Sequence, residues 1–250
     1  MSEGTLREQR RAERVARERA QAAAATRRAR LLRLAGAAGL AAVAVTAAVL
    51  VSSAGDQPSA ASDSSATGDA AALVRGLPER GGVLGDPDAP VTVTEYVDLQ
   101  CPVCAESART ILPGLVQDYV RTGEVKLAAR TLHFLGPDSV RAARVAAGAE
   151  RQGRLWPFLL AFYAAQGPEN SGYATDEHLR DIAAAAGVDA DRALGHARSG
   201  SATGRLERAN ADADRLGIQS TPTFTVQRGD GPAEVVTGGL GAALDTALAR

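Results

Sequence analysis

The sequence predicts an α/β fold with a helical insertion in its middle, preceded by a single N-terminal transmembrane helix. Strand patterns stand at both ends of residues 73–250, helical periodicity fills the interval between them, and a long uncharged segment lies near the N-terminus. The chain has 250 residues, of which 45% are hydrophobic and 23% are charged. It is therefore long enough to bury a core, and its composition is not that of a disordered protein.

Charge is distributed unevenly along the chain. Residues 1–33 contain ten Arg and four acidic residues, whereas residues 34–55 contain no charged residue. A helix over that uncharged segment would be roughly 33 Å long, which is close to the thickness of the hydrocarbon core of a bilayer. The arginines before the segment place the N-terminus in the cytoplasm. A cleaved signal peptide is the main alternative, although signal peptides normally have a shorter charged region.

The chain is therefore expected to have four parts. Residues 1–33 form a cytoplasmic Arg-rich tail, residues 34–55 the transmembrane helix, residues 56–72 a flexible linker and residues 73–250 the folded domain. The linker consists largely of Ser, Ala, Gly and Asp, and this composition cannot build a core. The net charge of −1 argues against a nucleic-acid-binding protein.

The folded domain begins with a strand, a helix and a second strand. Residues 91–98 are β-branched and aromatic and follow a turn at residues 85–90, while residues 124–131 form the second strand. Residues 101–119 between them are predicted to be helical, with a kink at Pro113. This order implies a parallel pair of strands with a right-handed connection.

Helical periodicity then continues to Leu216 as the predicted insertion, residues 138–216, with helices at 138–151, 154–166, 175–186, 189–198 and 203–216. The chain returns to strands near its C-terminus and closes with a helix, at residues 223–227, 233–236 and 240–249 respectively. A hairpin turn at residues 228–231 joins the last two strands.

The sequence Cys101-Pro-Val-Cys104 contains both cysteines of the protein and stands at the start of a predicted helix. Unpaired N–H groups and the helix dipole at that position would stabilise a thiolate on Cys101. Cys104, one turn further on, should be less exposed and able to attack a mixed disulfide on Cys101. The residues therefore favour a redox pair, in a domain that lies on the oxidising side of the membrane.

Two other uses of the cysteines fit less well. A disulfide that closes so short a loop would contribute only about 2 kcal/mol to stability. A zinc site would need two further ligands, and none of the three histidines has a second ligand at a typical spacing (His133, His178 and His196). Neither a metal nor another cofactor is expected.

The sequence around the cysteines, residues 82–115, resembles the start of the DsbA-like thiol–disulfide oxidoreductases, which have a thioredoxin fold. Residues 217–224 are similar to the G-I-x-x-T-P-x-F loop of that family, and residues 136–158 resemble its helical insertion. The resemblance implies that Cys101 is the attacking nucleophile and Cys104 the resolving thiol.

The same resemblance assigns three further residues. Pro222 matches the family's cis-proline, and Thr221 matches the residue that faces the cysteines and helps to hold the substrate backbone. Glu95 matches a buried acidic residue that relays protons for the resolving cysteine; an edge carboxylate in a strand is the alternative interpretation. Strongly oxidising members have a His between the cysteines, whereas this chain has Pro-Val, and we therefore expect a less strong oxidant.

The expected function is oxidation of cysteine pairs in unfolded secreted or membrane proteins, outside the cytoplasmic membrane of a bacterium. The resemblance implies a separate quinone-linked membrane protein that reoxidises the pair. A thiol reductase or isomerase that uses the same site is an alternative, and so is a non-catalytic binding module in which Cys101 would be buried and inert. A redox potential near that of thioredoxin would favour reduction.

Three other features invite a functional interpretation. His133 follows the second strand and is interpreted as a partly exposed loop histidine. Asp98, three residues before Cys101, could either cap the loop or influence the thiolate. An aromatic cluster at helical spacing is interpreted as core of the insertion rather than a ligand cage, namely Trp156, Phe158, Phe162 and Tyr163.

Overall fold

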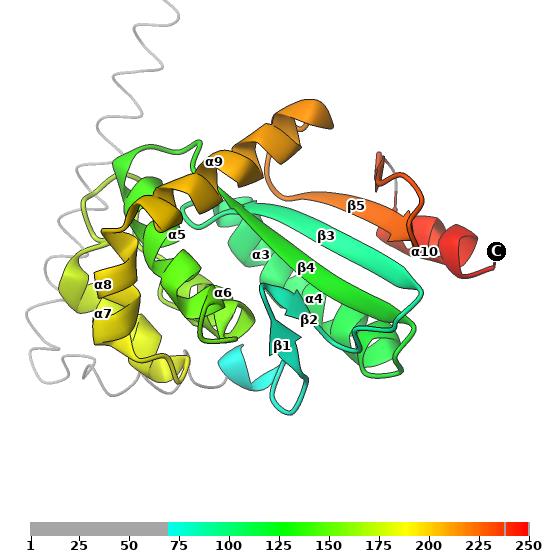
Figure 1. Ribbon diagram of the computed structural model, residues 1–250, viewed down its shortest axis with the longest axis horizontal. Coiled ribbons are helices and arrows are strands. Elements are labelled where there is room, and N and C mark those ends of the chain that lie inside the picture. Colours follow the sequence, from blue (N-terminus) through cyan, green and yellow to red (C-terminus); the bar gives the residue numbers. More distant parts are fainter. Residues whose placement is uncertain (1–69, 238, 250) are drawn as a thin grey trace, which may run out of the picture. The chain divides into compact units, whose positions relative to one another are not determined.

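The computed structural model describes residues 70–237 and 239–249. The predicted tail, the predicted transmembrane helix and most of the predicted linker lie outside these residues. Within the described ranges, no helix combines the length and the apolar composition needed to cross a bilayer. The α/β architecture predicted for the folded domain is confirmed (Figure 1).

A six-stranded sheet, in the order β1-β2-β4-β3-β5-β6, forms the centre of the domain. β3 (Val91–Asp98) lies parallel to β4 (Val125–Leu132), as the strand–helix–strand order predicts, and antiparallel to β5 (Thr223–Arg228). β6 (Glu234–Val235) pairs with β5 at one edge. The other edge is a hairpin of β1 (Glu79–Arg80) and β2 (Val83–Leu84), which was not predicted because two residues are too few to show an alternating pattern.

The segment between β3 and β4 is helical, and it is interrupted at the predicted place. One residue, Ile111, separates α3 (Pro102–Thr110) from α4 (Leu112–Leu115), and α4 continues into a π-helical turn, η1 (Val116–Val120). Pro113 stands in the first turn of α4 and has no N–H to bond to the preceding turn, so the helix breaks there. These helices pack in one core with the insertion and the sheet.

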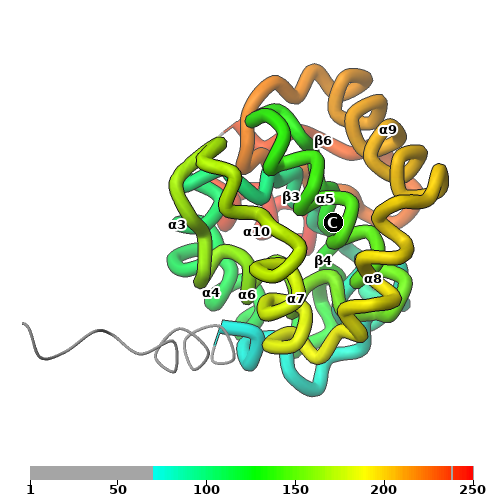
Figure 2. The backbone as a smooth tube through the Cα atoms, turned by 90° about the vertical axis from the view of Figure 1, so that its left-hand side faces the viewer, coloured from blue at the N-terminus to red at the C-terminus, as the bar shows by residue number. Residues whose placement is uncertain are grey.

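The insertion has the five predicted helices, namely α5 (Pro137–Glu150), α6 (Leu155–Ala164), α7 (Asp176–Ala185), α8 (Ala190–Ala197) and α9 (Gly200–Arg215). The last three are capped by the side-chain oxygens of Thr175, Asp189 and Ser199. Because Ser199 caps α9, that helix begins three residues before the predicted start. Seen from the side of the insertion in Figure 2, α7 and α8 lie nearest the viewer.

The aromatic cluster of the insertion is core, as expected. Trp156, Phe158 and Phe162 are at most 1% exposed and belong to the same apolar cluster as the sheet residues beneath them. The helices of the insertion approach one another closely. A Cβ added to Gly148 of α5 would lie 2.6 Å from the Ala193 backbone of α8, so no larger residue fits there.

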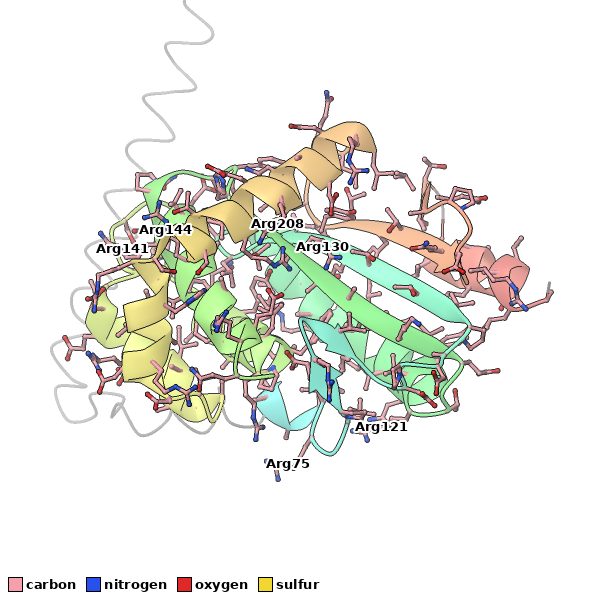
Figure 3. The ribbon with its side chains drawn as sticks, viewed as in Figure 1. Arg75, Arg121, Arg130, Arg141, Arg144 and Arg208 are labelled. Atoms are coloured by element: carbon pink, nitrogen blue, oxygen red, sulfur yellow. The ribbon has the colours of Figure 1, made fainter. Side chains whose placement is uncertain are left out.

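Polar contacts join the edges of the domain to the insertion and to η1. Glu79 of β1 accepts the backbone N–H groups of Leu155 and Trp156 in the first turn of α6, at 2.6 and 3.2 Å. Arg121, at the lower edge of Figure 3, donates to the carbonyl oxygens of Leu73 and Arg75. The final helix, α10 (Leu240–Leu248), contacts β5 and buries Leu244. Of these contacts, those of Glu79 hold the hairpin edge of the sheet against the insertion.

Candidate active site

The predicted redox motif lies at the N-terminus of α3, directly beyond the carboxyl end of β3. Cys101 is the N-cap residue, with an extended backbone (φ −71°, ψ 116°), and its Sγ accepts the backbone N–H of Cys104 at 3.3 Å. Both cysteines are free thiols. The first turn of α3 contains no acidic side chain, so no carboxylate of that turn offsets the dipole at this end of the helix.

The two cysteines have different surroundings, in the order the sequence predicts. Both cysteines are buried, Cys104 completely and Cys101 with 5% of its surface exposed. Because Cys101 is buried, its reactivity decides between the redox pair and the non-catalytic binding module. Burial raises the pKa of the Cys104 thiol far above its ordinary value, and the neighbouring Cys101 raises it further. Val103 between them is 60% exposed, so this end of α3 faces solvent. Cys101 is therefore the sulfur nearer to the surface, and the buried Cys104 thiol holds its proton strongly.

A loop from the far end of the sequence completes the surroundings of Cys101. The Thr221–Pro222 peptide bond is cis, as the resemblance implies. The Cys101 thiol donates to the Thr221 carbonyl oxygen, with 3.3 Å between the two atoms. Because β5 begins at Thr223 and pairs with β3, the sheet brings this loop beside a cysteine 120 residues earlier in the chain. Thr221 thus faces the cysteine pair, as predicted.

Glu95 is buried beneath the motif rather than exposed at an edge. It lies in β3, which has strands on both sides, and it is 4% exposed. Its Oε1 accepts the hydroxyl of Ser107, one turn beyond Cys104 on α3, at 3.1 Å. Burial raises the pKa of Glu95 to about 7, although the bond from Ser107 opposes the shift. The alternative of an edge carboxylate is wrong, and the proton relay stays a prediction.

Replacing Glu95 by glutamine tests this burial through the dependence of stability on pH. The pKa of Glu95 rises from 4.5 to about 7 on folding, so between these values the folded protein holds a proton that the unfolded chain has lost. The wild type should therefore lose stability as pH rises through this window, and Glu95→Gln should not lose that part. We expect the variant to gain about 3 kcal/mol over the wild type between about pH 5 and about pH 8.

The measurement is chemical unfolding of the full chain in detergent, with both proteins compared at each pH. Glu79, whose pKa burial also raises to about 7, titrates in both proteins and so cancels from the comparison. Glu106→Gln removes an exposed carboxylate from α3, the helix that covers Glu95 through Ser107, and is the control. A difference between Glu95→Gln and wild type that does not change with pH would contradict the buried, raised carboxyl.

Asp98 joins the cysteine motif to the insertion. It is fully buried at the end of β3, and its carboxylate accepts three hydrogen bonds, from Gln100 N at 2.9 Å, Ser139 Oγ at 2.6 Å and Leu135 N at 3.1 Å. Gln100 is part of residues 99–101, here called the active-site loop, whereas Ser139 lies in the first turn of α5 and Leu135 just before that helix. Of the two roles left open by the sequence, these contacts support capping of the loop.

Gln100 and Gln166 are site residues that the sequence analysis missed. The buried Gln100 side chain donates to the Leu135 carbonyl at 2.8 Å, and it accepts the Asn170 N–H at 2.6 Å. Gln166, just beyond α6, donates to the carbonyls of Leu99 and Cys101. Glutamine is usually a surface residue, so a glutamine beside a motif does not stand out in a sequence. Only the burial of Gln100 in the structure distinguishes it. No pattern in the sequence indicates these contacts.

His133 lies outside this group of residues. It is half-buried after β4, and its Nε2 is hydrogen-bonded to Asn210 Nδ2 of α9 at 2.8 Å. The structure therefore confirms the partly exposed loop histidine. Within the described ranges, no three His, Cys, Asp or Glu side chains gather closely enough to hold a metal ion.

Comparisons with known proteins agree with this geometry. A family model described as thioredoxin matches residues 79–231. Over 101 residues the chain is 36% identical to a probable disulfide bond formation protein D of Bacillus anthracis, and the match covers 40% of this chain and 46% of that protein. Over 170 residues it is 33% identical to a Na(+)/H(+) antiporter NhaA of Herminiimonas arsenicoxydans, a match that covers 64% of this chain and 25% of that protein.

The fold is also found among solved structures. Oxidised BdbD from Bacillus subtilis superimposes with a TM-score of 0.61 at 23% sequence identity, covering 70% of this chain and 98% of that one. The chain thus spans nearly the whole of this structure, but only a quarter of the antiporter and about half of the Bacillus anthracis protein.

Proposed function

This chain belongs to the thioredoxin family as a DsbA-like member, and we propose that it is an extracytoplasmic protein disulfide oxidoreductase that oxidises cysteine pairs in secreted proteins. One observation supports the chemistry above all others. The Cys101 sulfur caps α3 and accepts the Cys104 N–H, while Cys104 lies buried one turn inside. A helix N-terminus favours negative charge on the first sulfur, so Cys101 is the better leaving group and the sulfur that a client attacks.

The proposed reaction has two exchange steps. A thiolate of the reduced client attacks Sγ of Cys101 in the Cys101–Cys104 disulfide; a bond between client and Cys101 forms, and Cys104 leaves with the electron pair and takes up a proton. The second client thiolate then attacks the client sulfur of this mixed disulfide and releases Cys101 as a thiolate. The client loses two electrons and gains a disulfide, while the enzyme gains two electrons and becomes a dithiol.

The first step needs a proton for Cys104. Burial keeps the pKa of the Cys104 thiol high, so its thiolate is strongly basic when it leaves. Glu95 has a pKa of about 7 and can therefore be protonated at neutral pH. Ser107, which donates to Glu95, stands one turn beyond Cys104 on the same helix. This placement supports the proposed transfer of a proton from the Glu95 carboxyl to Cys104.

Clients are proposed to bind in an extended conformation along the loop of Thr221 and Pro222. Backbone hydrogen bonds hold such a segment irrespective of its side chains, which suits an enzyme with many unfolded clients. Two exposed apolar side chains stand next to residues of the site, Val103 between the cysteines and Phe134, which is 45% exposed and precedes the Leu135 bonded to Asp98. They would contact apolar residues of an unfolded client.

The domain is proposed to lie on the outer face of a bacterial cytoplasmic membrane, anchored by residues 34–55. Arginines before an uncharged segment support this orientation, and disulfide formation suits an oxidising compartment. The likeness to a protein named as a Na(+)/H(+) antiporter is compatible with a place at a membrane. A separate quinone-linked membrane protein is the proposed reoxidant of the Cys101–Cys104 dithiol.

The redox potential of the Cys101–Cys104 pair tests the direction of the reaction. We expect the full chain, equilibrated with glutathione, to have a potential clearly above the roughly −270 mV of thioredoxin and below the roughly −120 mV of DsbA, since no His stands between the cysteines. A potential near that of thioredoxin would indicate a reductase instead of an oxidase. A pair that does not exchange with glutathione at all would indicate a binding module without catalysis.

A further inference from the structure

The insertion reaches the active-site loop through two side chains at the end of α6. Tyr163, in the last turn of the helix, donates its hydroxyl to the Asp98 carbonyl at 3.3 Å. Gln166, three residues later, donates its amide to the Leu99 carbonyl at 2.7 Å and to the Cys101 carbonyl at 3.2 Å. Neither residue belongs to the cysteine motif or to the Thr221–Pro222 loop.

These donors meet the backbone on both sides of Cys101. The Asp98 carbonyl that accepts Tyr163 also accepts the Cys101 N–H at 3.0 Å. The Cys101 carbonyl that accepts Gln166 also accepts the Ala105 N–H, the first hydrogen bond of α3, at 3.2 Å. Leu99 is completely buried, so its carbonyl depends on a protein donor. Hydrogen bonds from the end of α6 therefore hold the Cys101 backbone in place, independently of the contacts that the Cys101 sulfur makes.

The position of the sulfur is sensitive to that backbone. Its contacts to the Cys104 N–H and to the Thr221 carbonyl are both 3.3 Å long, and they come from two different segments. A small rotation of the Cys101 backbone would lengthen one or both contacts. Only the reduced form needs the Cys104 N–H to support negative charge on Cys101, so a loss of this contact destabilises the dithiol relative to the disulfide.

The phenol of Tyr163 is also buried close to the reacting groups. Burial raises the pKa of its phenol well above the ordinary value, and negative charge on Cys104, Glu95, Asp98 and Cys101 raises it further. The phenol therefore remains a neutral hydrogen-bond donor, suited to hold a carbonyl and unsuited to exchange protons at neutral pH.

We propose that Tyr163 and Gln166 are positioning residues through which the helical insertion sets the redox potential of the Cys101–Cys104 pair. This inference rests on the proposed redox function of the pair, although not on the direction of the reaction. The structure gives each residue a matched control within the insertion. Gln152 makes the same kind of side-chain to backbone bonds, but to Asp189, and the ring of Tyr173 packs on Phe162 and His178.

The test is the equilibrium between the full chain in detergent and glutathione, measured for Gln166→Leu and Tyr163→Phe and for the controls Gln152→Leu and Tyr173→Phe. We expect Gln166→Leu and Tyr163→Phe each to shift the equilibrium constant about tenfold towards the disulfide, or about 30 mV to a more negative potential. The controls should keep the wild-type constant. Tyr163→Phe removes only one oxygen, so it keeps the test valid if Gln166→Leu folds poorly.

The outcomes separate this inference from the proposed function. Variants with the wild-type constant, or controls that shift it equally, would overturn the positioning role while leaving the redox pair intact. A wild-type potential near that of thioredoxin would overturn the proposed direction, and the shift between variants would still measure the positioning role. A wild-type pair that does not exchange with glutathione would overturn both.

Discussion

Replacing Cys104 by serine should leave the protein covalently attached to its clients through Cys101. In the reduced wild type, Cys104 can attack a mixed disulfide on Cys101 and release the client, because it lies one turn inside the same helix. Serine cannot perform this attack, so mixed disulfides with oxidised clients should accumulate. We expect species of higher mass on non-reducing gels of cells that express Cys104→Ser, and their collapse to the monomer on reduction. Catalytic turnover with two-cysteine clients should be lost.

Two further variants identify the sulfur that forms these adducts. Cys101→Ser should form no adducts, since Cys104 is completely buried and its thiol keeps its proton. The double variant with serine at both positions should behave in the same way. Adducts that persist in Cys101→Ser, or a Cys104→Ser protein with no adducts to secreted proteins, would contradict the assignment of Cys101 as the attacking sulfur.

Replacing Asp98 by alanine should cause the largest loss of stability among single changes near the site. The carboxylate accepts hydrogen bonds from Gln100 N, Ser139 Oγ and Leu135 N. Alanine would leave these donors without their charged acceptor, and each unpaired donor costs about 1 kcal/mol or more. We therefore expect the free energy of unfolding to fall by about 3 kcal/mol or more. Exchange with glutathione should also slow, because the active-site loop loses its anchor to the insertion.

The free energy of unfolding from denaturant titration of the full chain measures this loss. Asp118→Ala removes an exposed carboxylate from η1 and is the control, with an expected change within about 0.5 kcal/mol. Asp98→Asn keeps one carbonyl acceptor, so its loss of stability should lie between those of Asp98→Ala and Asp118→Ala. If Asp98→Ala lost no more stability than Asp118→Ala, the carboxylate would not join the loop to the insertion as described.

Much of the fold could be predicted because local chemistry determines it. The β-branched run at 91–98, the position of Pro113 and the capping residues of the insertion each indicate an element without knowledge of its neighbours, and the structure has these elements at nearly the predicted bounds. The redox pair was predicted from the cysteine motif at the start of a helix, and the Thr221–Pro222 loop from the resemblance. The structure places them in contact through the Cys101 sulfur and the Thr221 carbonyl.

The supporting residues of the site could not be predicted in the same way. Glu95 was named, but its burial depends on β4 and β5, which flank β3 in the sheet, and on α3, whose Ser107 bonds to it. Gln100, Tyr163 and Gln166 each make one or two hydrogen bonds to backbone groups 35 to 70 residues away, and such bonds leave no period or spacing in a sequence. The β1–β2 hairpin was missed for a related reason, since its two-residue strands are defined by their partners alone.

The most direct test of the account is transfer of a disulfide from the protein to a client. The full chain, first oxidised with excess oxidised glutathione and then freed of it, is mixed without oxygen with a reduced peptide that contains two cysteines. Free thiols on both molecules are then counted by alkylation and mass spectrometry. Two thiols should disappear from the peptide for each pair that appears at Cys101 and Cys104. If the peptide keeps its thiols while the protein keeps its disulfide, or if the disulfide never forms, the account is wrong.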